Sequence, residues 1–161
     1  MSVNVGNRKQ SRIEVLNTAL KLNDAISQLS LRSFGIRSRN SPLRRKYQNL
    51  VKSDDSEILD NFIMSKQLDI EDLGDKIVRY VNAAQAIYPR FESEFNTRLE
   101  YQNKALATCE MVDKTLNKVA STFDVDIMYF KEVVLLLNNE KHLIIEWRKN
   151  DRYKFKGHLL H

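Results

Sequence analysis

The sequence contains few of the residues that interrupt regular structure. Its 161 residues include four glycines and two prolines, under 4% of the chain, where about 12% is usual. Phosphate-binding loops need closely spaced glycines, and these stand far apart, at positions 6, 35, 74 and 157. This spacing excludes a P-loop, a dinucleotide-binding loop and a serine-hydrolase elbow. We therefore expect an almost wholly helical protein.

Cysteine and metal-binding motifs are also scarce. Cys109 is the only cysteine, which excludes an intramolecular disulfide, and its apolar surroundings predict a buried thiol. The Glu-x-x-His motif of di-iron bundles does not occur. The nearest arrangement, His142 with Glu146 one turn later and Glu140 nearby, is more simply a surface link. We expect no metal, no other cofactor and no enzymatic activity.

The chain has no long apolar run. The longest, from Val133 to Leu137, is far shorter than the roughly 20 residues that span a bilayer. Residues 1–10 are polar and lack the apolar core of a secretory signal. We therefore expect a cytoplasmic protein without a membrane partner.

Charge, in contrast, is abundant and segregated. Residues 1–53 carry a net charge of +9, residues 54–140 carry −8, and residues 141–161 carry +4, within a total of +5. No acid lies between Asp24 and Asp54. Such basic regions attract polyanions. The simpler interpretation is solubility, together with docking against the acidic region of a second copy.

Four segments show the apolar spacing of amphipathic helices. They run over residues 11–34, 53–88, 90–123 and 127–148. Gly35 is suited to end the first helix, and Gly74 within the second predicts a bend or a close helix contact. The short connections favour antiparallel neighbours. We predict an all-α fold, an up-down-up-down four-helix bundle forming one domain over residues 1–161. Residues 1–10 and 153–161 are expected as flexible tails and residues 35–53 as a long basic connection.

The fourth segment has more apolar positions than one core stripe needs. Beside a main stripe that includes Phe130, Leu137 and Ile144, a second stripe consists of Val133, Leu136, Leu143 and Trp147. We interpret this second stripe as an interface between subunits, because large exposed apolar patches usually mark interfaces. The expected assembly is a homo-oligomer.

Two basic regions are candidates for binding RNA or DNA. Cations neutralise phosphates, and aromatic rings stack on unpaired bases. From Trp147 to Lys156 aromatic residues alternate with cations, although cations near a helix C-terminus also have an ordinary electrostatic explanation. The candidate residues are Arg148, Lys149, Arg152 and Lys154 in this run, and Arg37, Arg39, Arg44, Arg45 and Lys46 in the basic connection.

Several short motifs resemble a known family. They are Arg32-Ser33-Phe34-Gly35-Ile36, Ala86-Ile87-Tyr88-Pro89, Arg98 with Tyr101-Gln102-Asn103, Phe123-Asp124-Val125-Asp126, and Trp147-Arg148. In these motifs the chain resembles the accessory variability determinant group, small four-helix-bundle proteins encoded beside the reverse transcriptases of diversity-generating retroelements. The resemblance implies a non-enzymatic, ring-like homo-oligomer such as a pentamer. It also implies binding to RNA, DNA and the reverse transcriptase, in support of template-RNA-directed cDNA synthesis.

The residues themselves leave an alternative open. A structural or adaptor bundle would bind a protein partner through the apolar face of its last helix, and its charges would then serve solubility. The dependence of nucleic-acid affinity on salt separates the two functions, since only phosphate binding releases many counterions.

Overall fold

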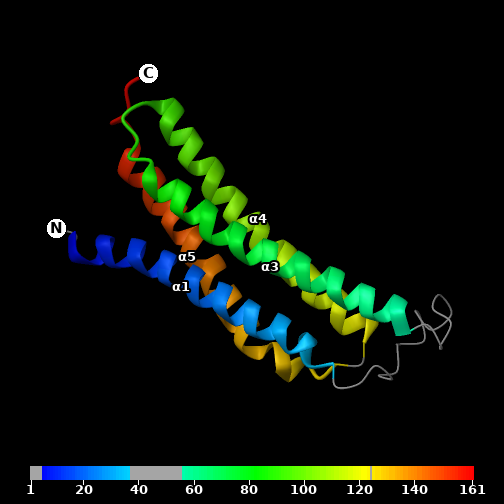
Figure 1. Ribbon diagram of the computed structural model, residues 1–161. Helices are drawn as coiled ribbons and strands as arrows, with labels where there is room; N and C mark the ends of the chain where they lie inside the picture. Colours follow the sequence, from blue (N-terminus) through cyan, green and yellow to red (C-terminus); the bar gives the residue numbers. More distant parts are fainter. Residues whose placement is uncertain (1–4, 37–55, 124) are drawn as a thin grey trace.

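The computed structural model describes residues 5–36, 56–123 and 125–161, without the side chains of residues 5–13 and 56. These ranges are mainly helical and contain no strand, only isolated bridge residues. The described ranges form the long helices α1 (Val5–Leu31), α3 (Ser56–Ala86), α4 (Glu92–Thr122) and α5 (Lys131–Phe155), which Figure 1 labels, and the short 3₁₀ helices η1 (Ser33–Gly35) and η2 (Ile127–Phe130). The predicted all-α class is confirmed.

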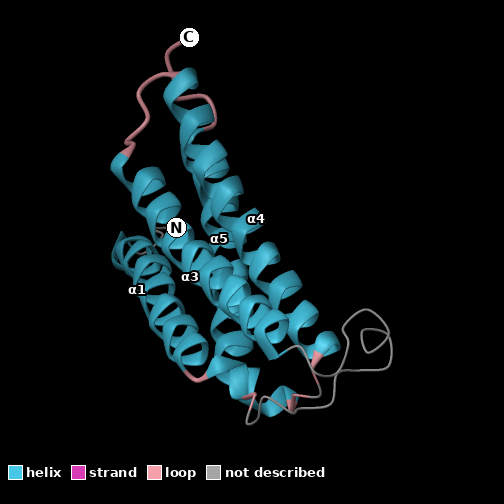
Figure 2. Cartoon of the chain, turned by 45° about the vertical axis from the view of Figure 1, so that its right-hand side comes forward, coloured by secondary structure: helices cyan, strands magenta, loops and turns pink. Residues whose placement is uncertain are grey.

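The long helices lie side by side in a bundle-like fold (Figures 1 and 2). Both α3 and α5 pack against α1 and α4. The apolar stripes of the four helices meet in one core, whose fully buried members include Leu22, Ile26, Ile70, Ile77, Leu137 and Ile144. Each helix therefore buries an arc that faces two neighbours.

This arrangement corrects the interpretation of the second apolar stripe on α5. Val133 and Trp147 are buried in the core of the single chain, and Leu136 and Leu143 are half-buried against it. The sequence pattern assigns all four residues to a subunit interface. Val133 and Trp147 instead belong to the chain's own core, because α5 contacts both α1 and α4 and so needs a wide apolar arc. For the half-buried Leu136 and Leu143 the subunit interface stays a prediction.

Two glycines lie at close contacts between helices. Gly35 has a φ of +76°, and a Cβ there would lie 2.7 Å from the ring of Tyr129 in η2. A Cβ on Gly74 of α3 would lie 2.4 Å from Oδ1 of Asn23 in α1. The prediction of a close helix contact at Gly74 is confirmed, whereas α1 ends at Leu31, before Gly35, which instead ends the short helix η1.

Helix α5 is longer than its apolar pattern predicts. The pattern is lost at Lys149, yet α5 continues to Phe155, because Asp151 on its buried face is paired with an arginine of α4. The chain then returns to the corner between α3 and α4. There Leu160 N–H donates to Arg90 O (3.1 Å) and Glu92 N–H donates to Leu160 O (3.0 Å).

Candidate nucleic-acid interface

A buried ion pair organises the end of the fold where α5 finishes. Arg98 of α4 and Asp151 of α5 are only 1% and 3% exposed. Arg98 donates from Nε to Oδ2 (2.6 Å) and from Nη2 to Oδ1 (3.1 Å) of the Asp151 carboxylate. Gln102, one turn after Arg98, donates a third hydrogen bond to Oδ2 (2.6 Å). Such charge-assisted bonds compensate the carboxylate for its loss of hydration.

Arg98 also reaches the corner between α3 and α4. Its Nη1 donates to the carbonyl oxygens of Ala84 (3.2 Å), in the last turn of α3, and of Ile87 (2.7 Å), the first residue after α3. Its guanidinium carbon lies 5.1 Å from the centre of the Trp147 ring, within the range of a cation–π contact. One side chain thus fixes the ends of α3, α4 and α5 relative to each other.

The buried pair determines the charge of the surface above it. Asp151 is the only acid from Trp147 to His161, and Arg98 neutralises it inside the protein. Lys149, Arg152 and Lys156 remain exposed, and none of the three forms an ion pair with any carboxylate in the described ranges. This end of α5 therefore presents cations without an intervening acid, which favours phosphate binding.

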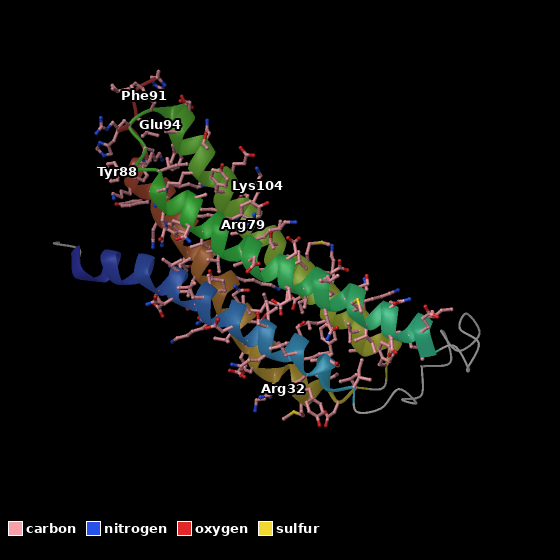
Figure 3. All side chains as sticks on the ribbon, in the orientation of Figure 1. Arg32, Arg79, Tyr88, Phe91, Glu94 and Lys104 are labelled. Atoms are coloured by element: carbon pink, nitrogen blue, oxygen red, sulfur yellow. The ribbon has the colours of Figure 1, made fainter. Side chains whose placement is uncertain are left out.

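Aromatic rings lie beside these cations. The Lys154 ammonium is 5.2 Å from the ring centre of Tyr88 and 5.1 Å from that of Phe155. Tyr88 meets Phe155 edge to face at 6.0 Å, and Phe155 packs on Phe95 at 5.7 Å. Figure 3 shows Tyr88 at this end of the bundle, in the corner after α3. Because Tyr88 is 63% exposed, its ring is accessible to a ligand.

The predicted site residues divide into three groups. Arg148, Lys149, Arg152 and Lys154 all lie on the last turns of α5, with Arg148 and Lys154 half-buried. Trp147 is buried beside Arg98, so it is unavailable for stacking on a base. The basic residues Arg37, Arg39, Arg44, Arg45 and Lys46 lie outside the described residues.

Tyr88 was not among the sequence-derived site residues. The sequence marks it only as the residue before Pro89, at a predicted corner. Its proximity to Lys154 depends on the packing of the last turn of α5 against that corner. The sequence feature that could have indicated Tyr88 is an aromatic residue at the end of one helix together with a run of aromatic and basic residues at the end of another.

A second carboxylate lies buried further along α5. Glu140 is fully buried, and neither of its oxygens has a hydrogen-bond partner among the described residues. Burial raises the pKa of Glu140 to about 8. Burial, followed by the charge of Glu140, raises the pKa of the Cys109 thiol on α4 to about 12. The predicted buried thiol is confirmed, and the raised pKa makes it a poor nucleophile at neutral pH.

The expectations about metals and membranes can be compared with the described ranges only. Within them, no group of three or more His, Cys, Asp or Glu residues is placed to hold a metal ion. His142 is exposed, whereas Glu140 points into the core, so the two do not form a joint site. No helix of the described chain is sufficiently long and apolar to cross a membrane.

The fold and this site define an all-helical protein with a cationic and aromatic end. The chain matches no protein-family model, and it matches neither a curated protein nor a solved structure. A functional assignment therefore depends on the charge, burial and geometry of its own residues.

Proposed function

We propose that this protein is a non-enzymatic nucleic-acid-binding protein, whose phosphate contacts are made by the end of α5. The observation that carries the proposal is the burial of Asp151 against Arg98. With Asp151 buried, all the exposed charges from Lys149 to Lys156 are positive. The exposed ring of Tyr88 beside Lys154 supports binding to unpaired bases.

The proposal includes the cellular role that the resemblance implies. In that role the protein is a cytoplasmic accessory partner of a retroelement reverse transcriptase and supports copying of a template RNA into cDNA. Its architecture would be an up-down-up-down four-helix bundle that assembles into a homo-oligomer. The contacts of α3 and α5 with both α1 and α4 support the bundle. The meeting of Arg98 with Ile87 and Trp147 supports a shared role for three of the resembling motifs.

The dependence of affinity on salt tests the proposal. We expect single-stranded RNA to bind with a logarithmic salt slope of about 0.7 for each neutralised phosphate. A triple variant, Lys149→Gln with Arg152→Gln and Lys156→Gln, removes three exposed cations and should lower the slope by about two units. Fluorescence anisotropy of a labelled RNA over a salt series measures this change.

The matched control removes three cations from the other end of the helices. Lys114, Lys118 and Lys131 are exposed near the end of α4 and the start of α5. Changing these three to Gln alters the net charge equally but should leave the slope near that of the wild type. Equal losses in both triple variants would show that only net charge matters and would contradict the assignment to the end of α5.

A protein-binding adaptor is the second candidate, favoured by one observation. Leu135 and Ile145 are exposed large apolar residues on α5. Absence of salt-dependent RNA and DNA binding by the wild type would reject the first function and favour the adaptor. Multi-angle light scattering of Leu135→Ser with Ile145→Ser would then test whether these residues hold a second copy.

A further inference from the structure

A pocket lies between the corner after α3 and the chain segment after α5. Its volume is about 430 Å³, within the range of roughly 300–1,000 Å³ that ligand pockets show. Its lining residues are Tyr88, Pro89, Arg90, Lys154, Phe155, His158, Leu159 and Leu160. The two hydrogen bonds between the backbone of Leu160 and that of Arg90 and Glu92 hold the far wall in place.

The lining combines aromatic rings with cations. Tyr88 is exposed, while Phe155 beneath it is buried and packed on Phe95, so the rings rest on the core. Arg90 and Lys154 supply positive charge, and no acid occurs among the described lining residues. A lone phosphate would make no use of the rings, and an apolar ligand would make no use of the cations. A flat ring that carries a phosphate uses both.

The acids nearest to the corner are engaged elsewhere. The Glu94 carboxylate accepts the N–H groups of Arg90 (2.7 Å) and Phe91 (3.2 Å) at the start of α4, and these hydrogen bonds lower the pKa of Glu94. Glu92 lies 3.1 Å from the ring of His161. Figure 3 shows Glu94 and Phe91 at this same end of the molecule. Both carboxylates lie outside the pocket lining, in which Arg90 and Lys154 are the permanent cations and no acid occurs.

We infer that this pocket holds one unpaired nucleotide of a single strand, with its base against Tyr88 and its phosphate beside Arg90 and Lys154. The inference rests on the nucleic-acid binding proposed above and adds a preference for single strands over duplexes. Bases within a duplex are stacked on their neighbours and have no free face for Tyr88. The adjacent cations of α5 then bind the phosphates that follow in the strand.

Substitution of Tyr88 tests this inference. Tyr88→Leu removes the ring but keeps an apolar side chain, and should weaken binding of a short single-stranded oligonucleotide by about 5- to 100-fold. Tyr88→Phe keeps the ring and should restore near wild-type affinity. The matched control is Tyr153→Leu, since Tyr153 is 80% exposed on the same end of α5 but does not line the pocket. Affinity for a duplex of the same sequence should not change in any variant.

A spectroscopic readout does not depend on the folding of the Tyr88→Leu variant. The fluorescence of 2-aminopurine in a single-stranded oligonucleotide should be quenched when the base stacks in the wild-type complex. Binding of adenosine monophosphate alone tests whether the pocket holds a free nucleotide instead of a nucleotide within a strand. Saturable binding of that nucleotide that depends on Tyr88, with oligonucleotide affinity unaffected by Tyr88→Leu, would overturn the assignment to a strand.

Failure of the inference and failure of the proposed function are distinguishable. Equal single-strand affinity of Tyr88→Leu and Tyr153→Leu, with no 2-aminopurine quenching, would overturn the pocket and leave the cationic interface intact. Absence of binding by the wild type to single strands and duplexes alike would overturn the proposed function itself.

Discussion

Two carboxylates on the buried face of α5 have opposite environments. Asp151 and Glu140 stand eleven residues apart, about three helical turns, and both are buried. Asp151 accepts three hydrogen bonds, two from Arg98 and one from Gln102. Glu140 accepts none within the described chain, and burial raises its pKa to about 8. The same helix thus carries one compensated and one uncompensated acid.

The comparison shows how position decides the chemical state of a buried acid. Removal of a carboxylate from water costs several kcal/mol unless a partner compensates for it. Arg98 provides that compensation at the end of the fold, where three helices meet. No ion pair of Glu140 occurs among the described residues, and the adjacent Lys141 pairs with Glu110 and Asp113 of α4. Glu140 therefore avoids the cost by remaining protonated at neutral pH.

The largest expected effect comes from breaking the compensated pair. Arg98→Met leaves the Asp151 carboxylate buried without its cation and should lower the free energy of unfolding by about 3–5 kcal/mol. Urea denaturation at pH 7 measures the loss. The double variant Arg98→Met with Asp151→Leu leaves no buried charge at this position and should recover most of the stability. A single-variant loss below about 1 kcal/mol would contradict the role given to the pair.

The uncompensated acid predicts a dependence of stability on pH. The folded-state pKa of Glu140 is about 8, above its ordinary value of 4.5, so the folded protein holds a proton that the unfolded chain releases. Stability is then greatest below about pH 4.5 and falls by up to about 1.4 kcal/mol per pH unit as pH rises to about 8. Glu140→Gln should remove this contribution. As the pH rises from 4 to 7, the free energy of unfolding of the Glu140→Gln variant should increase by about 1–3 kcal/mol relative to that of the wild type.

Denaturation curves over a pH series test this prediction. The matched control is Glu132→Gln, because Glu132 is an exposed glutamate on the first turn of the same helix. The control should follow the wild-type pH dependence. If Glu140→Gln also follows it, Glu140 is ionised in the folded protein and has a compensating partner.

The sequence predicts the helices better than it predicts these two acids. Apolar spacing depends only on neighbours along the chain, which is why α3 and α4 agree with it and why Gly74 could be interpreted. The burial of Asp151 depends on Arg98, 53 residues away. In the sequence, an acid on an apolar stripe looks like the end of a helix. The apolar pattern therefore predicts an end of α5 at residue 148, several residues before its actual end at Phe155.

The candidate site was predictable to a similar extent. A run of cations is visible in the sequence, so Lys149 and Arg152 could be proposed directly. The contact between Arg98 and the ring of Trp147 could not be proposed in this way, because it joins residues on two different helices. The role of Tyr88 could not be proposed from the sequence either, because the pocket forms only when Leu160 returns to the backbone of Arg90.

The smallest expected effect concerns the third hydrogen bond to Asp151. Gln102→Met removes the donor Nε2 but leaves both bonds from Arg98. It also removes Oε1 of Gln102, which is buried without a partner in the described chain, and this relief offsets part of the loss. We expect the free energy of unfolding to fall by about 1 kcal/mol in urea. Gln28→Met, at an exposed position on α1, is the control and should change it by less than about 0.5 kcal/mol.

The result for Gln102 ranks the partners of the buried carboxylate. A loss as large as that of Arg98→Met would mean that Asp151 needs all three hydrogen bonds, so the bidentate arginine alone would not compensate it. A loss no larger than that of Gln28→Met would mean that Arg98 is sufficient. The intermediate result that we expect would place the main compensation in the opposite charge of Arg98, which is the feature that Glu140 lacks.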